Sequence, residues 1–356
     1  MKKIVSILGA RPQFIKAAMV SRALSQYPEI QEVLLHTGQH YDDVMSQIFF
    51  RELDIKKPEY NLNINQLSRA DMIATMVLAI KTVLVKEAPD LVLVYGDTNS
   101  TLAGAMAANN LNAVLAHVEA GLRSFNQNMP EELNRIEADK LADILFCPCQ
   151  RACTELVNEG YAHKQIVNAG DVMYDAALHF LPIAEIKSTI LKKLALKNYL
   201  LATVHRAENT DNESSLKNIF AALDKINNTL PVIIPTHPRT KHQLTTYNIK
   251  TNCQLIEPVG YLDMLCLLKH SQLVATDSGG LQKEAYFLNK NCLVLRTETE
   301  WEELIAHGSH ILTGADPAVI CNAFNKLQNK TPSSQINLYG NGQASQTIAD
   351  IIKDSR

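Results

Sequence analysis

Three acidic residues are candidates for acid–base chemistry, and one of them, Glu119, stands where a carboxylate would be partly withdrawn from water. Asp97 directly follows the apolar run 91–95, and Glu119 follows another apolar run and precedes a glycine. Glu131 lies at the start of a predicted helix, four residues before Arg135. Partial burial raises the pKa of a carboxyl group toward values that suit proton transfer. If the three groups converge on one cleft, they could remove a proton from carbon or oxygen and return it.

The same pattern also allows purely structural roles for these residues. Asp97 could only cap the helix that follows it, a contribution of about 1 kcal/mol. Glu131 and Arg135 could form a surface ion pair worth about 0.3 kcal/mol. Glu132 points to another side of the predicted helix, so we expect it to be a structural partner.

A predicted anion site lies in the second half of the chain. The turn Ser278-Gly279-Gly280 joins the apolar run 273–276 to a predicted helix. The free N–H groups and the dipole at such a helix start attract an anion. Glu284, further along the same helix, could accept hydrogen bonds from a ribose diol. This segment therefore predicts binding of a nucleoside diphosphate.

Cationic residues follow predicted strands in both halves. Arg11 and Lys16 come after the apolar run 4–8, and His205 comes after the run 200–204. A histidine at a strand end could meet a phosphate or a substrate hydroxyl. Taken singly, each is equally well explained as an ordinary loop or helix residue.

The elements that must position these groups alternate between short apolar runs and longer amphipathic segments. Such alternation predicts parallel sheets covered by helices on both faces. Open sheets of this kind bind ligands at the carboxyl ends of their strands. The predicted strands form two series, 4–8, 33–35, 91–95, 114–116, 144–146 and 165–168, then 200–204, 232–235, 254–257, 273–276, 292–295 and 311–312.

We therefore expect an α/β protein with two Rossmann-like domains facing a central cleft, an architecture like that of the GT-B glycosyltransferases. The predicted N-terminal domain, 1–169, carries the acid–base carboxylates, and the predicted C-terminal domain, 170–337, binds the nucleotide. The last segment, 338–356, is expected to form a helix that packs back on the N-terminal domain.

Composition narrows the class of protein. The 356 residues are 46% hydrophobic and 20% charged with a formal net charge of −3, which describes a globular protein and disfavours nucleic acid as a partner. No apolar stretch approaches the roughly 18 residues of a membrane span, and no signal peptide is recognised, so we expect a cytoplasmic protein without a membrane partner. The odd number of cysteines, seven, indicates reduced thiols, and their spacing predicts no metal site.

Taken together, the motifs resemble the non-hydrolysing UDP-N-acetylglucosamine 2-epimerases over nearly the whole chain. The resemblance implies a UDP-sugar substrate, a nucleotide held mainly by the second domain, a homodimer, and no cofactor or metal. The motifs that carry it are Gly9-Ala10-Arg11-Pro12 with Lys16, Tyr95-Gly96-Asp97-Thr98, His117 to Arg123, Met129 to Arg135, Gly170-Asp171-Val172, His205-Arg206 and Thr276 to Gly280.

The resemblance also implies a reaction. Members of this family convert UDP-N-acetylglucosamine to UDP-N-acetylmannosamine by eliminating UDP, forming a 2-acetamidoglucal and adding UDP back, typically for surface polysaccharide biosynthesis. The implied acid–base groups are Asp97, Glu119 and Glu131, with no assignment of which one removes the proton. The implied binding residues are His205 near the leaving phosphate, the cationic or substrate-contacting Arg11, Lys16 and Arg135, the diphosphate turn Ser278, Gly279 and Gly280, and the ribose ligand Glu284.

Departures from the best-known members point to a branch of the family. Gln13-Phe14 replaces Glu-Ala, Lys283 to Phe287 replaces Glu-Glu-Ala-Pro, and Thr299 to Glu303 replaces Thr-Glu-Arg-Pro-Glu. These features resemble the enzymes that act on UDP-2,3-diacetamido-2,3-dideoxyglucuronate. The alternatives are a hydrolysing epimerase, a glycosyltransferase with two Rossmann domains, and a regulator that binds a nucleotide sugar without turnover.

Some members carry a second, regulatory UDP-sugar site near the loop that corresponds to Gln39-His40. In this chain Asp42 replaces a common glutamine and Met76 replaces a common arginine. We therefore predict weak or absent activation by substrate.

Overall fold

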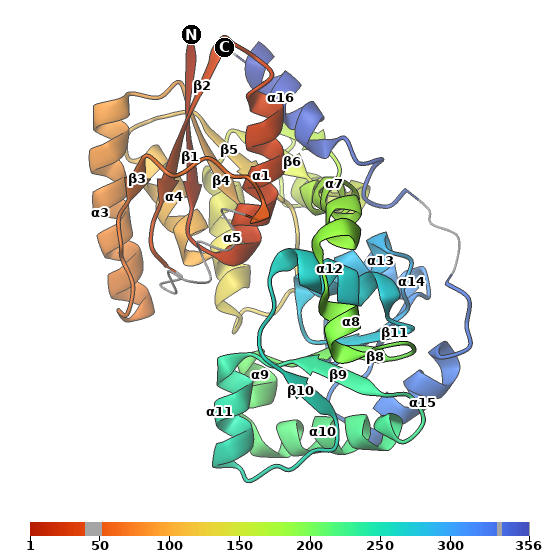
Figure 1. The fold of residues 1–356 in the computed structure, drawn as a ribbon. Coiled ribbons are helices and arrows are strands. Elements are labelled where there is room, and N and C mark those ends of the chain that lie inside the picture. The colour runs from red at the N-terminus through yellow and green to blue at the C-terminus, as the bar shows by residue number, and fades with distance from the viewer. Residues whose placement is uncertain (40–51, 333–336, 356) are drawn as a thin grey trace. The chain divides into compact units, whose positions relative to one another are not determined.

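The computed structural model describes residues 1–39, 52–332 and 337–355. The chain divides into two compact units, shown in Figure 1. The first unit contains Met1–Leu178 and Asn337–Arg356, and the second contains His179–Ile336. Each unit has one parallel sheet, which confirms the predicted α/β class. His40 and Asp42 of the predicted regulatory loop lie outside the described residues.

The sheet of the first unit has the strand order β3-β2-β1-β4-β5-β6-β7 in the described part of the chain. Its strands are β1 (Lys2–Leu8), β2 (Ile30–His36), β3 (Tyr60–Asn61), β4 (Leu91–Tyr95), β5 (Leu115–Val118), β6 (Ile144–Cys147) and β7 (Gln165–Asn168). Its helices are α1 (Arg11–Leu24), α3 (Arg69–Glu87), α4 (Asn99–Asn109), α5 (Pro130–Leu141), α6 (Gln150–Asn158) and α16 (Ala344–Asp354). Helix α7 (Val172–Lys187) contains the boundary between the units.

The second unit repeats the topology with the described order β10-β9-β8-β11-β12-β13. Its strands are β8 (Leu200–Thr203), β9 (Val232–Pro235), β10 (Gln254–Ile256), β11 (Leu273–Thr276), β12 (Cys292–Val294) and β13 (His310–Leu312). Its helices are α8 (Ile190–Leu194), α9 (Ala207–Thr210), α10 (Glu213–Asn227), α11 (Pro238–Thr246), α12 (Tyr261–His270), α13 (Gly279–Phe287), α14 (Glu302–Ala306) and α15 (Pro317–Leu327).

Both sheets have a point at which the strand order reverses. In the first unit the chain leaves β1 toward β2 and leaves β4 toward β5, so the connections depart in opposite directions. Because such crossovers are right-handed, α1 and α4 lie on opposite faces of the sheet and leave a crevice between β1 and β4. In the second unit the equivalent crevice lies between β8 and β11. Ligands of open α/β sheets bind at such crevices.

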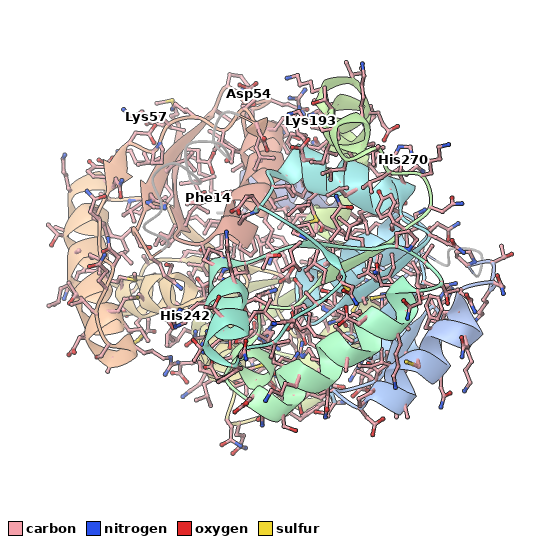
Figure 2. The ribbon with its side chains drawn as sticks, turned by 60° about the horizontal axis from the view of Figure 1, so that its bottom comes forward. Phe14, Asp54, Lys57, Lys193, His242 and His270 are labelled. Carbon is pink, nitrogen blue, oxygen red and sulfur yellow. The ribbon has the colours of Figure 1, made fainter. Side chains whose placement is uncertain are left out.

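Packing within each unit follows the apolar pattern of the sequence. In the first unit, β4 is buried along its whole length, and Phe14 of α1 (Figure 2) stacks on His36 of β2 with ring centroids 5.2 Å apart. In the second unit, α10 and α15 contribute Phe220 and Phe324 to one buried cluster with the strands. The described helices include none that is long and apolar enough to cross a membrane.

Helix α16 packs on α1 of the first unit. Its N-cap residue, Gln343, makes no capping hydrogen bond with its side chain. Asp175 of α7 supplies that function instead, because its carboxylate accepts hydrogen bonds from the N–H groups of Ala344 (3.1 Å) and Ser345 (2.7 Å). At the other end of α16, the ammonium group of Lys2 donates a 2.7 Å hydrogen bond to the carbonyl of Ile352.

Candidate active site

Gln13 links the two strand ends that border the crevice of the first unit. Its side-chain oxygen accepts hydrogen bonds from the N–H groups of Gly9 (2.8 Å) and Ala10 (2.9 Å), which follow β1. Its amide nitrogen donates to the carbonyl of Tyr95, the last residue of β4, at 2.8 Å. An amide accepts at one end and donates at the other, whereas an ionised carboxylate only accepts, so glutamine suits this position better than an ionised glutamate.

Lys16 and Glu119 form an ion pair beside this crevice. The Lys16 Nζ lies 2.5 Å from Glu119 Oε1, and the side chains are 7% and 9% exposed. A Cβ atom added to Gly96 would lie 3.0 Å from the same Nζ, so the lysine touches the turn that precedes Asp97. Glu119 has φ +75°, a left-handed conformation that is strained for a non-glycine residue. The predicted carboxylates therefore stand on two turns in contact with one lysine.

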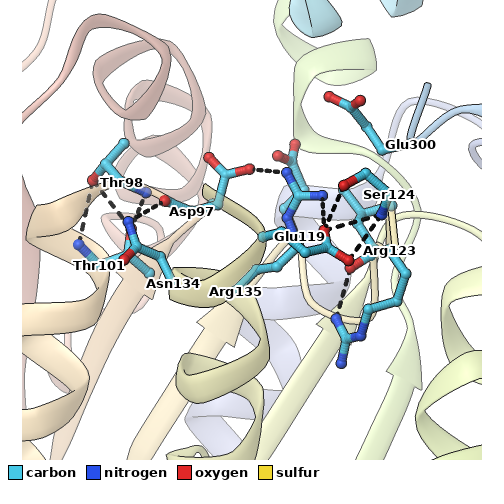
Figure 3. A network of polar contacts seen from close by, with 12 residues as sticks. Asp97, Thr98, Thr101, Glu119, Arg123, Ser124, Asn134, Arg135 and Glu300 are labelled. Atoms are coloured by element: carbon cyan, nitrogen blue, oxygen red, sulfur yellow. Dashed lines mark hydrogen bonds and ion pairs between the residues drawn. The ribbon is translucent and has the colours of Figure 1, made fainter. Parts of the chain in front are cut away.

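Asp97 pairs with Arg135 of α5, as Figure 3 shows. The aspartate is 29% exposed at its side chain, whereas the arginine is 3% exposed. Asn134 reinforces the turn by donating a 2.9 Å hydrogen bond to the backbone carbonyl of Asp97. The N-cap of α4 is Thr98, whose hydroxyl accepts from Thr101 N–H, so the capping role that the sequence left open for Asp97 belongs to its neighbour.

Glu132 has the structural role that the helix spacing predicted. Its carboxylate lies 2.8 Å from Arg135 Nη1 and is buried. It also accepts hydrogen bonds from the backbone N–H groups of Ser124 (3.0 Å) and Phe125 (2.9 Å). Glu131, one residue earlier, is half-buried on the first turn of α5.

His117 lies inside β5, which continues to Val118, whereas the predicted strand ended at residue 116. The predicted strand was too short because a histidine interrupts the apolar run. The ring of His117 is nevertheless fully buried, and both of its nitrogens are hydrogen-bonded. Its Nδ1 lies 2.7 Å from Asp139 Oδ1, and its Nε2 lies 2.7 Å from the carbonyl oxygen of Gly96. Asp139 is also 2.7 Å from Arg123 Nη1. Burial acts to raise the pKa of Asp139, but His117 and Arg123 lower it below its ordinary value.

In the second unit, Asp277 organises the crevice between β8 and β11. It is fully buried, and its carboxylate accepts hydrogen bonds from the backbone N–H groups of His205 (3.0 Å) and Arg206 (3.0 Å). It also accepts a 3.0 Å bond from Asn209 Nδ2. The His205 ring, 36% exposed, has its Nδ1 3.3 Å from Asp277 Oδ1. The buried carboxylate thus fixes the loop that presents His205.

The predicted anion turn begins α13. Ser278 is its N-cap and accepts a hydrogen bond from Leu281 N–H, and the first helical residues are Gly279 and Gly280. A Cβ atom on Gly279 would lie only 2.5 Å from Glu300 Oε1, whereas one on Gly280 would meet nothing closer than 3.9 Å. A side chain on Gly279 would therefore have to displace the Glu300 carboxylate, whereas Gly280 leaves space in front of the helix N-terminus. Glu284 is buried in the same helix.

Comparison with known proteins decides the family. The family model described as UDP-N-acetylglucosamine 2-epimerase matches residues 22–353. The UDP-2,3-diacetamido-2,3-dideoxy-D-glucuronate 2-epimerase of Pseudomonas aeruginosa is 48% identical over 98% of this chain and 99% of its own. The chain belongs to the UDP-N-acetylglucosamine 2-epimerase family.

Solved structures of this epimerase family have the same fold over the whole chain. The Methanocaldococcus jannaschii UDP-GlcNAc 2-epimerase in complex with UDP-GlcNAc and UDP has a TM-score of 0.94 and 40% identity, with 100% of both chains covered. The Neisseria meningitidis UDP-GlcNAc 2-epimerase bound to UDP-GlcNAc has a TM-score of 0.90 and 30% identity, over 99% of this chain and 100% of that one. These matches confirm the predicted family, the GT-B-like fold class and the assignment as an isomerase.

The remaining predictions concern Arg11, the segment around Gln39 and the cysteines. The side chain of Arg11 lies outside the described part of the structure. Gln39 accepts hydrogen bonds from Ser100 N (3.0 Å) and Ser100 Oγ (2.7 Å), and Met76 is buried on α3. All seven cysteines are free.

One described group could hold a metal ion, Glu185 with Cys266 and His270 in the second unit. It belongs to neither crevice, and His270 lies on the exterior of α12 (Figure 2). Glu185 Oε1 and His270 Nε2 already form a 2.9 Å hydrogen bond, which accounts for their proximity without an ion.

Sequence reasoning assigned no supporting role to four residues that hold the candidate site together, Gln13, His117, Asp139 and Asp277. They come from separate segments, and each contacts backbone groups distant in the sequence. For Asp139 the available signal was a charged residue on the face of α5 that bears Arg135, one helical turn away. For Asp277 the signal was an acidic residue between a buried strand and a glycine turn.

Proposed function

We propose that the protein inverts carbon 2 of a UDP-2-acetamido sugar by eliminating UDP and adding it back. The observation that carries this proposal is the pairing of two carboxylates with buried cations at the crevice of the first unit. Glu119 pairs with Lys16, and Asp97 pairs with Arg135. Two held carboxylates suit a reaction that removes a proton on one face of a carbon atom and returns it on the other.

A carboxylate takes the proton from carbon 2, and the electrons of that C–H bond form a carbon 1–carbon 2 double bond. The bond between carbon 1 and the phosphate oxygen breaks, and UDP leaves with that electron pair. A carboxylic acid then returns a proton to the opposite face of carbon 2, and UDP adds to carbon 1. The anion turn at Ser278 and the loop presenting His205 are the groups proposed to hold the departing diphosphate.

Asp97, Glu119 and Glu131 are the acid–base set, and Lys16 and Arg135 orient it. Arg11 is proposed to bind the substrate. In the second unit, Gly279 and Gly280 follow Ser278 in the diphosphate turn, and Glu284 binds the ribose. No cofactor or metal is invoked.

The substrate branch is the second point of the proposal. The 48% identity to the Pseudomonas aeruginosa enzyme favours UDP-2,3-diacetamido-2,3-dideoxyglucuronate over UDP-N-acetylglucosamine as the preferred sugar. The Gln13-Phe14, Lys283 and Trp301 departures support the same branch. Lys283 is buried with its Nζ 4.3 Å from the centre of the Trp301 ring, a cation–π contact in place of the glutamate and arginine of the best-known members.

Proton NMR in D2O tests reaction and substrate together. The purified protein is incubated with UDP-N-acetylglucosamine and, separately, with the 2,3-diacetamido-glucuronate analogue. We expect the epimer to carry deuterium at carbon 2, formed faster from the analogue, and Glu119→Gln and Asp97→Asn to lose this exchange. Free UDP accumulating in place of epimer would identify a hydrolysing enzyme. No exchange with either sugar would refute the proposed reaction on these substrates.

We further propose that the protein is a cytoplasmic homodimer serving surface polysaccharide synthesis. Exposed apolar residues on α3 support a dimer, because Leu78 is 69% exposed and Val85, seven residues later, is 63% exposed. Light scattering coupled to size-exclusion chromatography tests it. We expect twice the monomer mass for the wild type and a monomer for Leu78→Asp; a monomeric wild type would refute the dimer.

A further inference from the structure

His117 and Asp139 form a buried pair between the two turns that carry the proposed acid–base groups. The His117 Nδ1 and Asp139 Oδ1 atoms are 2.7 Å apart, and both side chains are 0% exposed. Neither residue reaches the solvent-facing side of the crevice, so neither can touch a substrate. The proposed reaction gives them no task of their own.

The histidine holds the first turn. Its Nε2 lies 2.7 Å from the carbonyl oxygen of Gly96, the residue before Asp97. A carbonyl only accepts hydrogen bonds, so Nε2 donates to Gly96. Gly96 has φ +60°, and the direction of its carbonyl determines where the chain leaves β4. The histidine thus fixes the orientation of the turn on which Asp97 stands.

The aspartate holds the second turn. Asp139 Oδ2 accepts a 3.1 Å hydrogen bond from the N–H of Gly121, two residues after Glu119. Gly121 has φ +80°, and a Cβ atom there would lie 2.4 Å from the carbonyl oxygen of Ala152, so this turn has no room to shift. The left-handed conformation of Glu119 persists only where its surroundings enforce it. The hydrogen bond from Gly121 to Asp139 helps to hold Glu119 in this conformation.

The aspartate also connects both turns to α5. Asp139 lies on the same helix as Arg135, one turn later, and Arg135 pairs with Asp97. Lys164 fixes the C-terminal end of α5 by donating to the carbonyls of Lys140 (2.6 Å) and Ala142 (2.6 Å). A single rigid helix therefore sets the positions of both carboxylate-bearing turns.

We propose that His117 and Asp139 are positioning residues of the epimerisation, which keep the Asp97 and Glu119 turns at one fixed separation. The inference rests on the proposed function, because it assumes that these two carboxylates act on carbon 2. Removal and return of a proton on opposite faces require two groups at a defined spacing. A displacement of about 1 Å costs a reaction of this kind about 10²-fold in rate.

The first experiment compares Asp139→Asn with Asp175→Asn. Both replace a buried carboxylate of the first unit, but the hydrogen bonds of Asp175 go to Ala344 and Ser345 at the start of α16 rather than to the turns of Asp97 and Glu119. We expect kcat per folded protein to fall about 10²-fold in Asp139→Asn with KM little changed, and to stay at the wild-type value in Asp175→Asn. Equal kcat in the two variants at equal folded fraction would show that Asp139 is only structural.

A second pair of variants separates the two hydrogen bonds of His117. The amide nitrogen of glutamine can replace Nε2 and keep the contact with Gly96, whereas that of asparagine replaces Nδ1 and keeps the contact with Asp139. If the Gly96 contact positions Asp97, His117→Gln retains more carbon 2 deuterium exchange than His117→Asn. The reverse order, or wild-type exchange in both, overturns the role of His117.

The two proposals fail in different ways. If Asp97→Asn and Glu119→Gln retain full exchange, the assigned acid–base groups are wrong and the proposed function falls with them. If those two variants lose exchange while Asp139→Asn matches its control, only the positioning role is refuted.

Discussion

Two neighbouring glutamates of α5, Glu131 and Glu132, are expected to give opposite results when each is changed to glutamine. Glu132 is 1% exposed and binds Arg135 together with the backbone of Ser124 and Phe125. Glutamine can keep the backbone contacts through its oxygen, but its amide group then points donors at the guanidinium. Glu131 is half-buried in the first helical turn and is proposed to act on the substrate.

The magnitude follows from the contacts. Removing one partner of a buried ion pair costs 3–5 kcal/mol, and the retained backbone bonds place Glu132→Gln at the lower end, about 3 kcal/mol. For a unit of about 200 residues this corresponds to a fall of about 6–12 °C in the melting temperature. Glu131→Gln removes a negative charge from the first turn of α5, where the helix dipole favours it, a change of about 0.3–1 kcal/mol in stability.

Scanning calorimetry and kinetics on the same preparations provide the assay. Glu131→Gln should keep its melting temperature and lose about 10²-fold or more in kcat, the usual contribution of a general acid or base. Glu132→Gln should melt early and retain most of its kcat per folded molecule at low temperature. Early melting of Glu131→Gln with a stable Glu132→Gln would refute the reasoning for both residues.

Further predictions concern the second unit and substrate activation. Burial lowers the pKa of His310 to about 4, so below pH 6.5 the unfolded chain takes up a proton that the folded ring does not. Acidification from pH 7.5 to 5 should therefore cost about 2 kcal/mol through this group, and denaturant titrations should show a smaller loss in His310→Gln. Gly279→Ala should destabilise the protein by displacing Glu300, whereas Gly280→Ala should preserve its melting temperature yet weaken UDP binding by calorimetry. Initial rates should depend hyperbolically on substrate; sigmoidal rates that a Gln39 substitution abolishes would contradict the absence of activation.

Much of the fold was predictable because the strands of a parallel sheet are buried on both faces. Uninterrupted apolar runs marked β4, β9 and β11 at their observed bounds. The two-residue strand β3 was missed, since Tyr60 and Asn61 carry no run at all. His117 was misplaced because its polarity is satisfied by Asp139 and Gly96, partners that only the folded chain brings near.

Candidate site residues could be proposed from the sequence where they directly follow strands. Their hydrogen bonds and ion pairs with distant segments could not be predicted. Asp97 and Glu119 were proposed because they end apolar runs, and the anion turn was proposed from its glycines. The pairing of Glu119 with Lys16, 103 positions earlier, follows from the adjacency of β1, β4 and β5 rather than from any local pattern. Sequence spacing reports neighbours along a helix or strand, but it does not report which strand ends share a crevice.

The contact between Lys2 and the end of α16 has a consequence for synthesis on the ribosome. The lysine is made among the first residues, while its partner carbonyl on Ile352 emerges 350 positions later. At about 5–20 residues per second, this interval is about 20–70 s. The second unit is continuous in sequence and is complete before α16 exists. Nascent chains therefore expose the surface of α1 that α16 later covers. We expect ribosome-associated chaperones to bind the first unit rather than the second.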